Sequence, residues 1–241
     1  MLANTSPFKW LIDFLIPIRC VKCGAILEDK EGLCPSCWPL ITFTAKPYCQ
    51  CCGLPFDFDI EEGAMCGACQ QERPSFKTAR SVFTYTGESK DLILKFKHTD
   101  HLSSAPIFAE WMANNLENIE NPLCVPVPLH WTRLFMRTYN QAGLLAQRIA
   151  RQKGWTYDPS LLMRKHRTPS QGHLSKKDRV KNVERVFCVP EKKKRDLAGK
   201  TILLIDDVYT TGATLEACSK TLLKAGAHEV HALTLGRVKK S

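Results

Sequence analysis

The sequence predicts an α/β protein with a mostly parallel sheet and a small cysteine-rich module in front of it. Four Cys-x-x-Cys pairs fall within residues 20–69, whereas strand-like and helical segments alternate after Pro74. Such alternation is typical of a parallel sheet that helices cover on both faces. A chain of 241 residues is long enough for two small domains. We therefore expect a cysteine-rich domain over residues 1–75 and an α/β domain over residues 76–241.

The hydrophobic pattern predicts the order of the elements. Strands are expected where short apolar runs meet turn residues, and helices where apolar residues recur with helical spacing. The expected strands cover residues 80–86, 123–129, 201–206 and 230–235. The expected helical segments cover residues 8–18, 89–97, 104–116, 140–153 and 214–225, the last capped by Gly226.

The cysteine spacing predicts two structural zinc sites. A Cys-x-x-Cys turn places two thiolates on one side of a tight knuckle, and two knuckles close a tetrahedral Zn²⁺ site. Four repeated knuckles without an adjoining βαβ pattern favour metal over thioredoxin-like redox pairs. Sequential pairing gives two Cys₄ ribbons, and spacing alone leaves interleaved pairing open. The expected ligands are Cys20, Cys23, Cys34 and Cys37 for one ion, and Cys49, Cys52, Cys66 and Cys69 for the other.

The chain lacks the sequence features of a membrane or secreted protein. No apolar stretch reaches the length of a membrane span. The first residues lack the basic start and the cleavage site of a signal peptide. We therefore expect a cytoplasmic protein, in which thiols stay reduced and cysteine pairs bind metal more often than they form disulfides.

The net charge of +10 is unevenly distributed along the chain. Residues 1–75 hold six Lys/Arg against nine Asp/Glu, and the remainder holds 28 against 15. Residues 164–195 alone hold twelve Lys/Arg against three Asp/Glu. Because a Zn²⁺ ion with four thiolates is formally negative, the cysteine-rich module is a poor anchor for a nucleic-acid backbone. An acidic partner is expected to meet the C-terminal part.

The segment at residues 202–214 carries the strongest functional signal. An apolar run stops at two adjacent carboxylates, Asp206 and Asp207, and passes into small and hydroxyl residues before a helical pattern. Ligands of open α/β sheets bind at the carboxyl ends of strands, and a helix N-terminus suits a phosphate. The carboxylates repel phosphate, so they face another group, most simply ribose hydroxyls or Mg²⁺. The expected phosphate loop consists of Thr210, Thr211, Gly212, Ala213 and Thr214.

Residues 202–214 resemble the 5-phosphoribosyl-1-pyrophosphate (PRPP) binding motif of the type I phosphoribosyltransferases. The whole chain resembles the ComF/GntX family, in which a double zinc ribbon is joined to a phosphoribosyltransferase-like domain. Thr138 is a departure, since the family usually has Gly there. Besides the cysteine pairs and the phosphate loop, the resemblance rests on the Val-Pro-Val-Pro-Leu run at 125–129, on Arg133, Arg137, Tyr139, Asn140 and Gln141, and on Gln171, Arg179 and Asn182.

The resemblance implies a role for each part of this site. Asp206 and Asp207 bind the ribose hydroxyls of PRPP, which binds together with Mg²⁺, and the loop at 210–214 holds its 5′-phosphate. Arg133 and Arg137 are candidates for holding the leaving pyrophosphate, because guanidinium groups bind phosphate bidentately. The two carboxylates and the two arginines are therefore the expected catalytic residues of an active enzyme.

Two functions from different classes fit these residues. The first, implied by the resemblance, is a protein of natural competence that binds Mg-PRPP and handles the single-stranded DNA taken up during transformation. The alternative is an active phosphoribosyltransferase of nucleotide or base salvage with no direct role in DNA handling. The zinc module can also recruit other competence or recombination proteins. The candidate nucleic-acid-binding residues are Lys176, Lys177, Arg179, Lys181 and Arg185.

Overall fold

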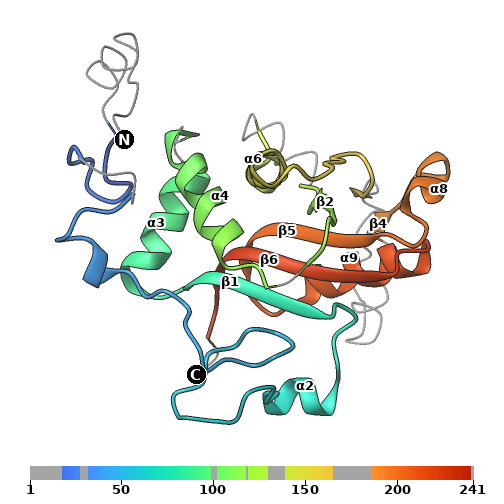
Figure 1. The fold of residues 1–241 in the computed structure, drawn as a ribbon, viewed down its shortest axis with the longest axis horizontal. Helices are drawn as coiled ribbons and strands as arrows, with labels where there is room; N and C mark the ends of the chain where they lie inside the picture. The colour runs from blue at the N-terminus through green and yellow to red at the C-terminus, as the bar shows by residue number, and fades with distance from the viewer. Residues whose placement is uncertain are drawn as a thin grey trace, which may run out of the picture.

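A parallel sheet of four strands forms the centre of the structure, a computed structural model that describes residues 18–27, 32–98, 102–117, 119–129, 139–164 and 186–239. The strands follow the order β1-β6-β5-β2 across the sheet, as Figure 1 shows. Each corresponds to one of the expected strands, so the predicted α/β class is confirmed. The strands are β1 (Thr78–Thr84), β2 (Leu123–Pro126), β5 (Thr201–Tyr209) and β6 (Glu229–Arg237).

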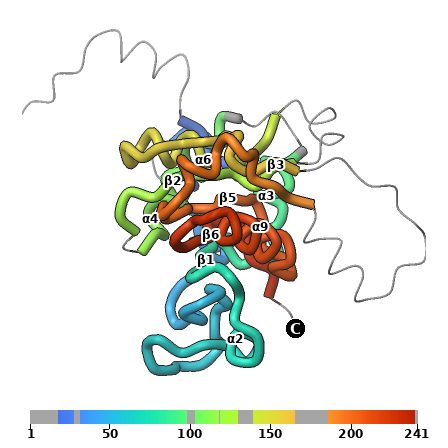
Figure 2. Tube along the Cα trace, turned by 90° about the vertical axis from the view of Figure 1, so that its right-hand side faces the viewer, coloured from blue at the N-terminus to red at the C-terminus, as the bar shows by residue number. Residues whose placement is uncertain are grey.

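The sheet separates two hydrophobic cores because successive strand residues point to opposite faces. Leu203 and Ile205 of β5 enter one core, while Ile202 and Leu204 enter the other. Figure 2 shows helices on opposite sides of the strands. The first core is covered by α3 (Gly87–His98), α4 (Ala105–Asn114) and α6 (Gln141–Lys153), and the second by α9 (Ala213–Lys224).

Several short elements connect these layers. β3 and β4 form a separate antiparallel pair. No helix within the described ranges is both long enough and apolar enough to span a bilayer. The short elements are η1 (Trp38–Leu40), α2 (Gly67–Gln71), η2 (Leu102–Ser104), β3 (Met163–Arg164), β4 (Phe187–Cys188), η3 (Glu191–Lys193) and α8 (Lys194–Leu197).

The cysteine-rich part of the chain lies along β1, the edge strand of the sheet. The N–H of Thr84 donates to the carbonyl of Thr42 at 2.9 Å, and the N–H of Ala79 donates to the carbonyl of Cys51 at 2.7 Å. An open strand edge carries unpaired polar groups that invite association with other chains. These backbone contacts cover that edge and attach the cysteine-rich module to the sheet.

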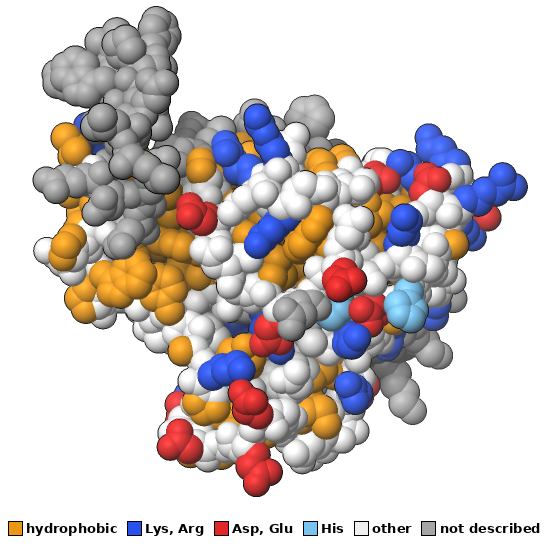
Figure 3. All heavy atoms as spheres, in the orientation of Figure 1, with side chains coloured by type: hydrophobic (Ala, Val, Ile, Leu, Met, Phe, Trp, Pro, Cys, Tyr) orange, Lys and Arg blue, Asp and Glu red, His pale blue; other side chains and the backbone are white. Residues whose placement is uncertain are grey.

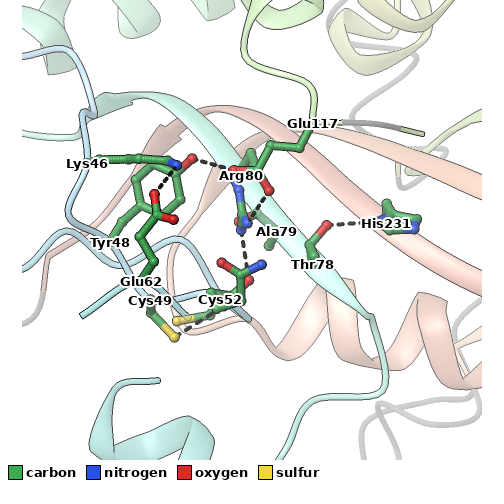
Figure 4. Close-up of polar contacts among 11 residues, drawn as sticks. Lys46, Tyr48, Cys49, Cys52, Glu62, Thr78, Ala79, Arg80, Glu117 and His231 are labelled. Carbon is green, nitrogen blue, oxygen red and sulfur yellow. Dashed lines mark hydrogen bonds and ion pairs between the residues drawn. The ribbon is translucent and has the colours of Figure 1, made fainter. Parts of the chain in front are cut away.

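Arg80 of β1 reinforces this attachment, as Figure 4 shows. Its guanidinium donates to the carbonyl of Gln50 at 3.1 Å and to Oε2 of Glu117 at 2.7 Å. It also lies 4.8 Å from the ring centroid of Tyr48. Because Arg80 is buried, one cation holds together the module, the edge strand and the segment after α4.

The surface reflects the uneven charge of the sequence. Figure 3 shows acidic side chains gathered at the lower end of the view, where Figure 1 places the second half of the cysteine-rich module. Basic side chains lie mainly over the upper and right-hand parts of that face. On this face, acidic side chains therefore predominate around α2, whereas basic side chains predominate over the upper part of the α/β body.

Several expected boundaries differ from the structure. The strand expected to end at Asp206 continues to Tyr209, because β6 is equally long and pairs with β5 as far as Arg237. The cap of α9 is Ala225 rather than Gly226, which follows it with a φ of 108°. The expected helix at 8–18 lies largely outside the described residues. The domain boundary between residues 75 and 76 stays a prediction.

Candidate functional site

The eight knuckle cysteines form two clusters in sequential order, which resolves the pairing that the sequence left open. Within each cluster the four sulfur atoms lie within 4.8 Å of one another. The Sγ atoms of Cys23 and Cys34 are 3.7 Å apart, and those of Cys52 and Cys66 are 3.6 Å apart. A tetrahedral site with Zn–S bonds of about 2.3 Å places its sulfurs about 3.8 Å apart. Both clusters therefore fit Zn²⁺.

The surroundings of the second cluster supply a further test of this fit. Arg237 at the end of β6 is 7% exposed, and its Nη2 donates to Sγ of Cys52 at 3.2 Å. No carboxylate pairs with it in the described part of the chain, and its Nε and Nη1 are buried without a partner there. A buried cation needs a nearby negative charge. Four thiolates around Zn²⁺ carry a formal charge of −2 and provide it.

The predicted acidic pair lies near the end of β5, close to a lysine that the sequence analysis did not assign. Nζ of Lys97, at the end of α3, lies 2.9 Å from Oδ2 of Asp207, and both side chains are largely buried. The N–H of Asp207 donates to Oδ1 of Asp206 at 2.8 Å. Burial, followed by the charge of Asp207, raises the pKa of Asp206 to about 7. Asp206 is therefore close to its ionisation point at neutral pH.

Lys97 belongs to the same site as the start of α6. Gln141, the first residue of α6, is buried and donates from Nε2 to the carbonyl of Lys97 at 3.2 Å. The preceding Asn140 donates from Nδ2 to the carbonyl of Val127 at 3.2 Å. These contacts bring the end of α3, the start of α6 and the end of β5 together. The sequence signal for Lys97 is weak, since it ends an ordinary amphipathic helix.

The expected phosphate loop connects β5 directly to α9. Its Thr210, Thr211, Ala213 and Thr214 are exposed, and α9 begins at Ala213. Gly212 has a φ of 85°, a left-handed conformation that favours glycine. A Cβ added there would lie 2.7 Å from Cε2 of Tyr209. The loop thus offers backbone N–H groups at a helix N-terminus, next to the two carboxylates.

A cavity of about 390 Å³ separates this loop from the second zinc ribbon. Its wall includes ligands of the second cluster, loop residues and the buried guanidinium of Arg237. Neither Asp206 nor Asp207 lines it, so it is distinct from the acidic end of the site. The other predicted residues lie outside the described ranges: Arg133, Arg137, Lys176, Lys177, Arg179, Lys181 and Arg185.

Comparison with known proteins identifies both parts of the chain. The family model of the double zinc ribbon domain matches residues 11–70, and that of the phosphoribosyl transferase domain matches residues 145–240. Competence protein F of Haemophilus influenzae is 32% identical over 230 residues, which cover 91% of this chain and 96% of that protein. The chain belongs to the competence protein F (ComF) family. The family resemblance seen in the sequence is thereby confirmed.

Other relatives extend the comparison. The Escherichia coli DNA utilization protein YhgH is 30% identical over 230 residues, which cover 92% of this ComF-family chain and 98% of that protein. A solved structure of glutamine PRPP amidotransferase from B. subtilis, complexed with ADP and GMP, is 21% identical. It aligns over 54% of this chain but only 25% of its own, with a TM-score of 0.39. A likeness that distant carries no argument about function.

Proposed function

We propose that this ComF-family protein binds PRPP with Mg²⁺ at the end of β5 and handles single-stranded DNA during natural transformation. The observation that carries the proposal is the loop at 210–214, which includes the N-terminus of α9 and follows Asp206 and Asp207. The match to the phosphoribosyl transferase domain supports the ligand class. The names of the relatives, competence protein F and DNA utilization protein, support the DNA role.

Different residues of the site bind different parts of PRPP. The N–H groups and hydroxyls of the loop bind the 5′-phosphate, which the positive end of the helix dipole favours. Asp206 and Asp207 accept hydrogen bonds from the ribose hydroxyls. A Mg²⁺ ion bound with the ligand would supply positive charge to balance the pyrophosphate. Lys97 pairs with Asp207 and orients its carboxylate, and Arg133 and Arg137 hold the pyrophosphate.

Single-stranded DNA is assigned to the basic segment at 164–195. Lysine and arginine side chains neutralise phosphates and release counterions, which gives affinity without sequence preference. Among the described residues of this segment, Lys192, Lys194 and Arg195 are exposed. The five candidates at 176–185 belong to the same basic segment of the sequence. The acidic zinc module does not bind DNA in this proposal; it contacts the protein body or other competence and recombination proteins.

Calorimetric titration of PRPP with Mg²⁺ tests the ligand assignment. The wild type is expected to bind saturably, and the double variant Asp206→Asn/Asp207→Asn is expected to lose binding. Asp196→Asn, which changes an exposed carboxylate of α8, is the matched control and should bind as the wild type does. Equal affinity in all three proteins rules out the acidic pair as the ribose site. Pyrophosphate release on addition of a nucleobase would favour the salvage enzyme instead.

A further inference from the structure

Arg237 links a ligand of the second zinc site to Tyr209, the residue directly before the phosphate loop. Its Nη2 donates to Sγ of Cys52 at 3.2 Å. Its guanidinium carbon also lies 3.9 Å from the ring centroid of Tyr209, the last residue of β5. Tyr209 and Arg237 are register partners at the ends of their paired strands. The guanidinium therefore lies between the sulfur cluster and the aromatic ring.

The ring of Tyr209 packs directly against the backbone of the loop. A Cβ at Gly212 would lie 2.7 Å from Cε2 and 2.8 Å from the hydroxyl oxygen of Tyr209, so the loop backbone rests directly on this ring. Phe76 packs edge-on against the ring, with centroids 6.1 Å apart and an interplanar angle of 87°. Two groups in direct van der Waals contact cannot approach further, so a displacement of one toward the other moves both. A shift of Tyr209 must move the loop.

A second connection reaches the first turn of α9. The N–H and the hydroxyl of Ser75, in the segment after α2, donate to the two carboxylate oxygens of Glu216 at 2.8 Å and 2.7 Å. The N–H of Glu216 in turn donates to the carbonyl of Gly212 at 2.8 Å. The chain that leaves the second ribbon is thus fastened to the same glycine that Tyr209 supports.

The first zinc cluster has no comparable connection in the described part of the chain. Cys20 and Cys37 belong to the core covered by α3 and α4, whereas the second cluster shares its core with Tyr209 and α9. A Cβ at Gly32 would lie 2.3 Å from a methyl of Ile107, which places the first ribbon against α4. The two metal sites therefore support opposite faces of the sheet.

We propose that the second zinc ribbon positions the phosphate loop, and that Arg237 and Tyr209 are the positioning residues. Bound metal keeps the sulfurs as thiolates that hold the guanidinium. The guanidinium holds the ring, and the ring holds the loop around Gly212. Both positioning residues line the cavity between ribbon and loop, together with Cys52 and Gly212. An effect of this coupling on PRPP affinity would depend on the proposed function, whereas the coupling of the metal site to the loop does not depend on it.

The test compares full-length wild type with Arg237→Gln in two measurements. Zinc transfer to a chromogenic chelator should show one of the two ions leaving roughly 10–100-fold faster, the range for loss of a group that supports a metal ligand. Hydrogen exchange by mass spectrometry should show faster exchange confined to residues 210–216, by roughly tenfold. Arg237→Lys supplies the same comparison if the glutamine variant does not fold.

Three further variants separate positioning from general stability. Cys23→Ser removes a ligand of the first cluster and should release that ion without altering exchange at 210–216. Tyr209→Leu should accelerate exchange at 210–216, whereas Tyr209→Phe, which keeps the ring, should not. Faster zinc release with unchanged exchange at 210–216, or faster exchange spread over the whole sheet, overturns the proposal.

A final arm separates this proposal from the assignment of PRPP. Coupling between two sites is reciprocal, so Mg-PRPP should slow release of the zinc that Arg237→Gln destabilises and leave the other unaffected. If Mg-PRPP does not bind, while the hydrogen exchange at 210–216 still depends on Arg237, the ligand assignment fails and the coupling of metal and loop stands. If Mg-PRPP binds but slows neither ion, the coupling does not reach the ligand site, and the proposal fails.

Discussion

Replacement of Arg80 by Met should loosen the zinc module from the sheet. Arg80 is 4% exposed and donates to the carbonyls of Gln50 and Ala79 and to the carboxylate of Glu117. The bond to the carboxylate is worth about 1.5–3 kcal/mol and each carbonyl bond about 1 kcal/mol. The Met variant no longer has to bury a charged group, and the desolvation penalty avoided in this way offsets about 2 kcal/mol of the loss. We expect a net loss of about 1.5–3 kcal/mol in the free energy of unfolding.

Urea unfolding followed by tryptophan fluorescence measures this loss. Lys77→Met is the matched control, because it removes an exposed ion pair with Glu229 beside the same strand and should change stability by less than about 1 kcal/mol. Hydrogen exchange should rise along β1 and the segment at 42–51, where the module pairs with it. A change in Arg80→Met no larger than in the control would refute the role of this cation.

Three further predictions concern the ligand sites. Gly212→Ala forces a left-handed conformation that costs a non-glycine residue about 1–3 kcal/mol, and we expect weaker PRPP binding by calorimetry together with lower stability in urea. Because Asp206 holds its proton below about pH 7, affinity for Mg-PRPP should increase as the pH rises through 7. Titrations in buffers of different ionisation heat should detect the released proton, and Asp206→Asn should retain only the pH dependence of the ligand itself. For DNA, we expect that replacing Lys176, Lys177 and Arg179 by Gln weakens the salt dependence of single-stranded DNA binding. Fluorescence anisotropy at increasing salt should show that the slope of log affinity against log salt becomes shallower by about 2. An unchanged slope would exclude these three side chains from contact with the DNA.

Local patterns in the sequence predicted much of the fold and part of the site. The cysteine pairs predicted the zinc ligands because a knuckle is formed by neighbouring residues. The segment from Ile202 to Thr214 predicted the strand, loop and helix, since its continuous apolar run and its turn residues are local signals too. The end of β5 was placed too early because strand length depends on the partner strand, and β6 extends to Arg237.

Contacts between distant residues could not be read in this way. Arg237 and Cys52 are 185 positions apart, and nothing in either neighbourhood indicates that they meet. Lys97 ends one helix and Asp207 lies in a strand more than a hundred residues later, so their ion pair depends on how α3 packs at the end of the sheet. The residues that join the zinc ribbon to the loop could therefore be identified only from the three-dimensional structure.

A crystal structure of the protein with PRPP and Mg²⁺ tests the phosphoribosyl site most directly. We expect the 5′-phosphate within hydrogen-bonding distance of the N–H groups at 211–214, and the ribose hydroxyls against Asp206 and Asp207. A phosphate bound instead in the cavity beside Arg237, or crystals that hold no PRPP at millimolar concentrations, would contradict the assignment of the ligand to the end of β5.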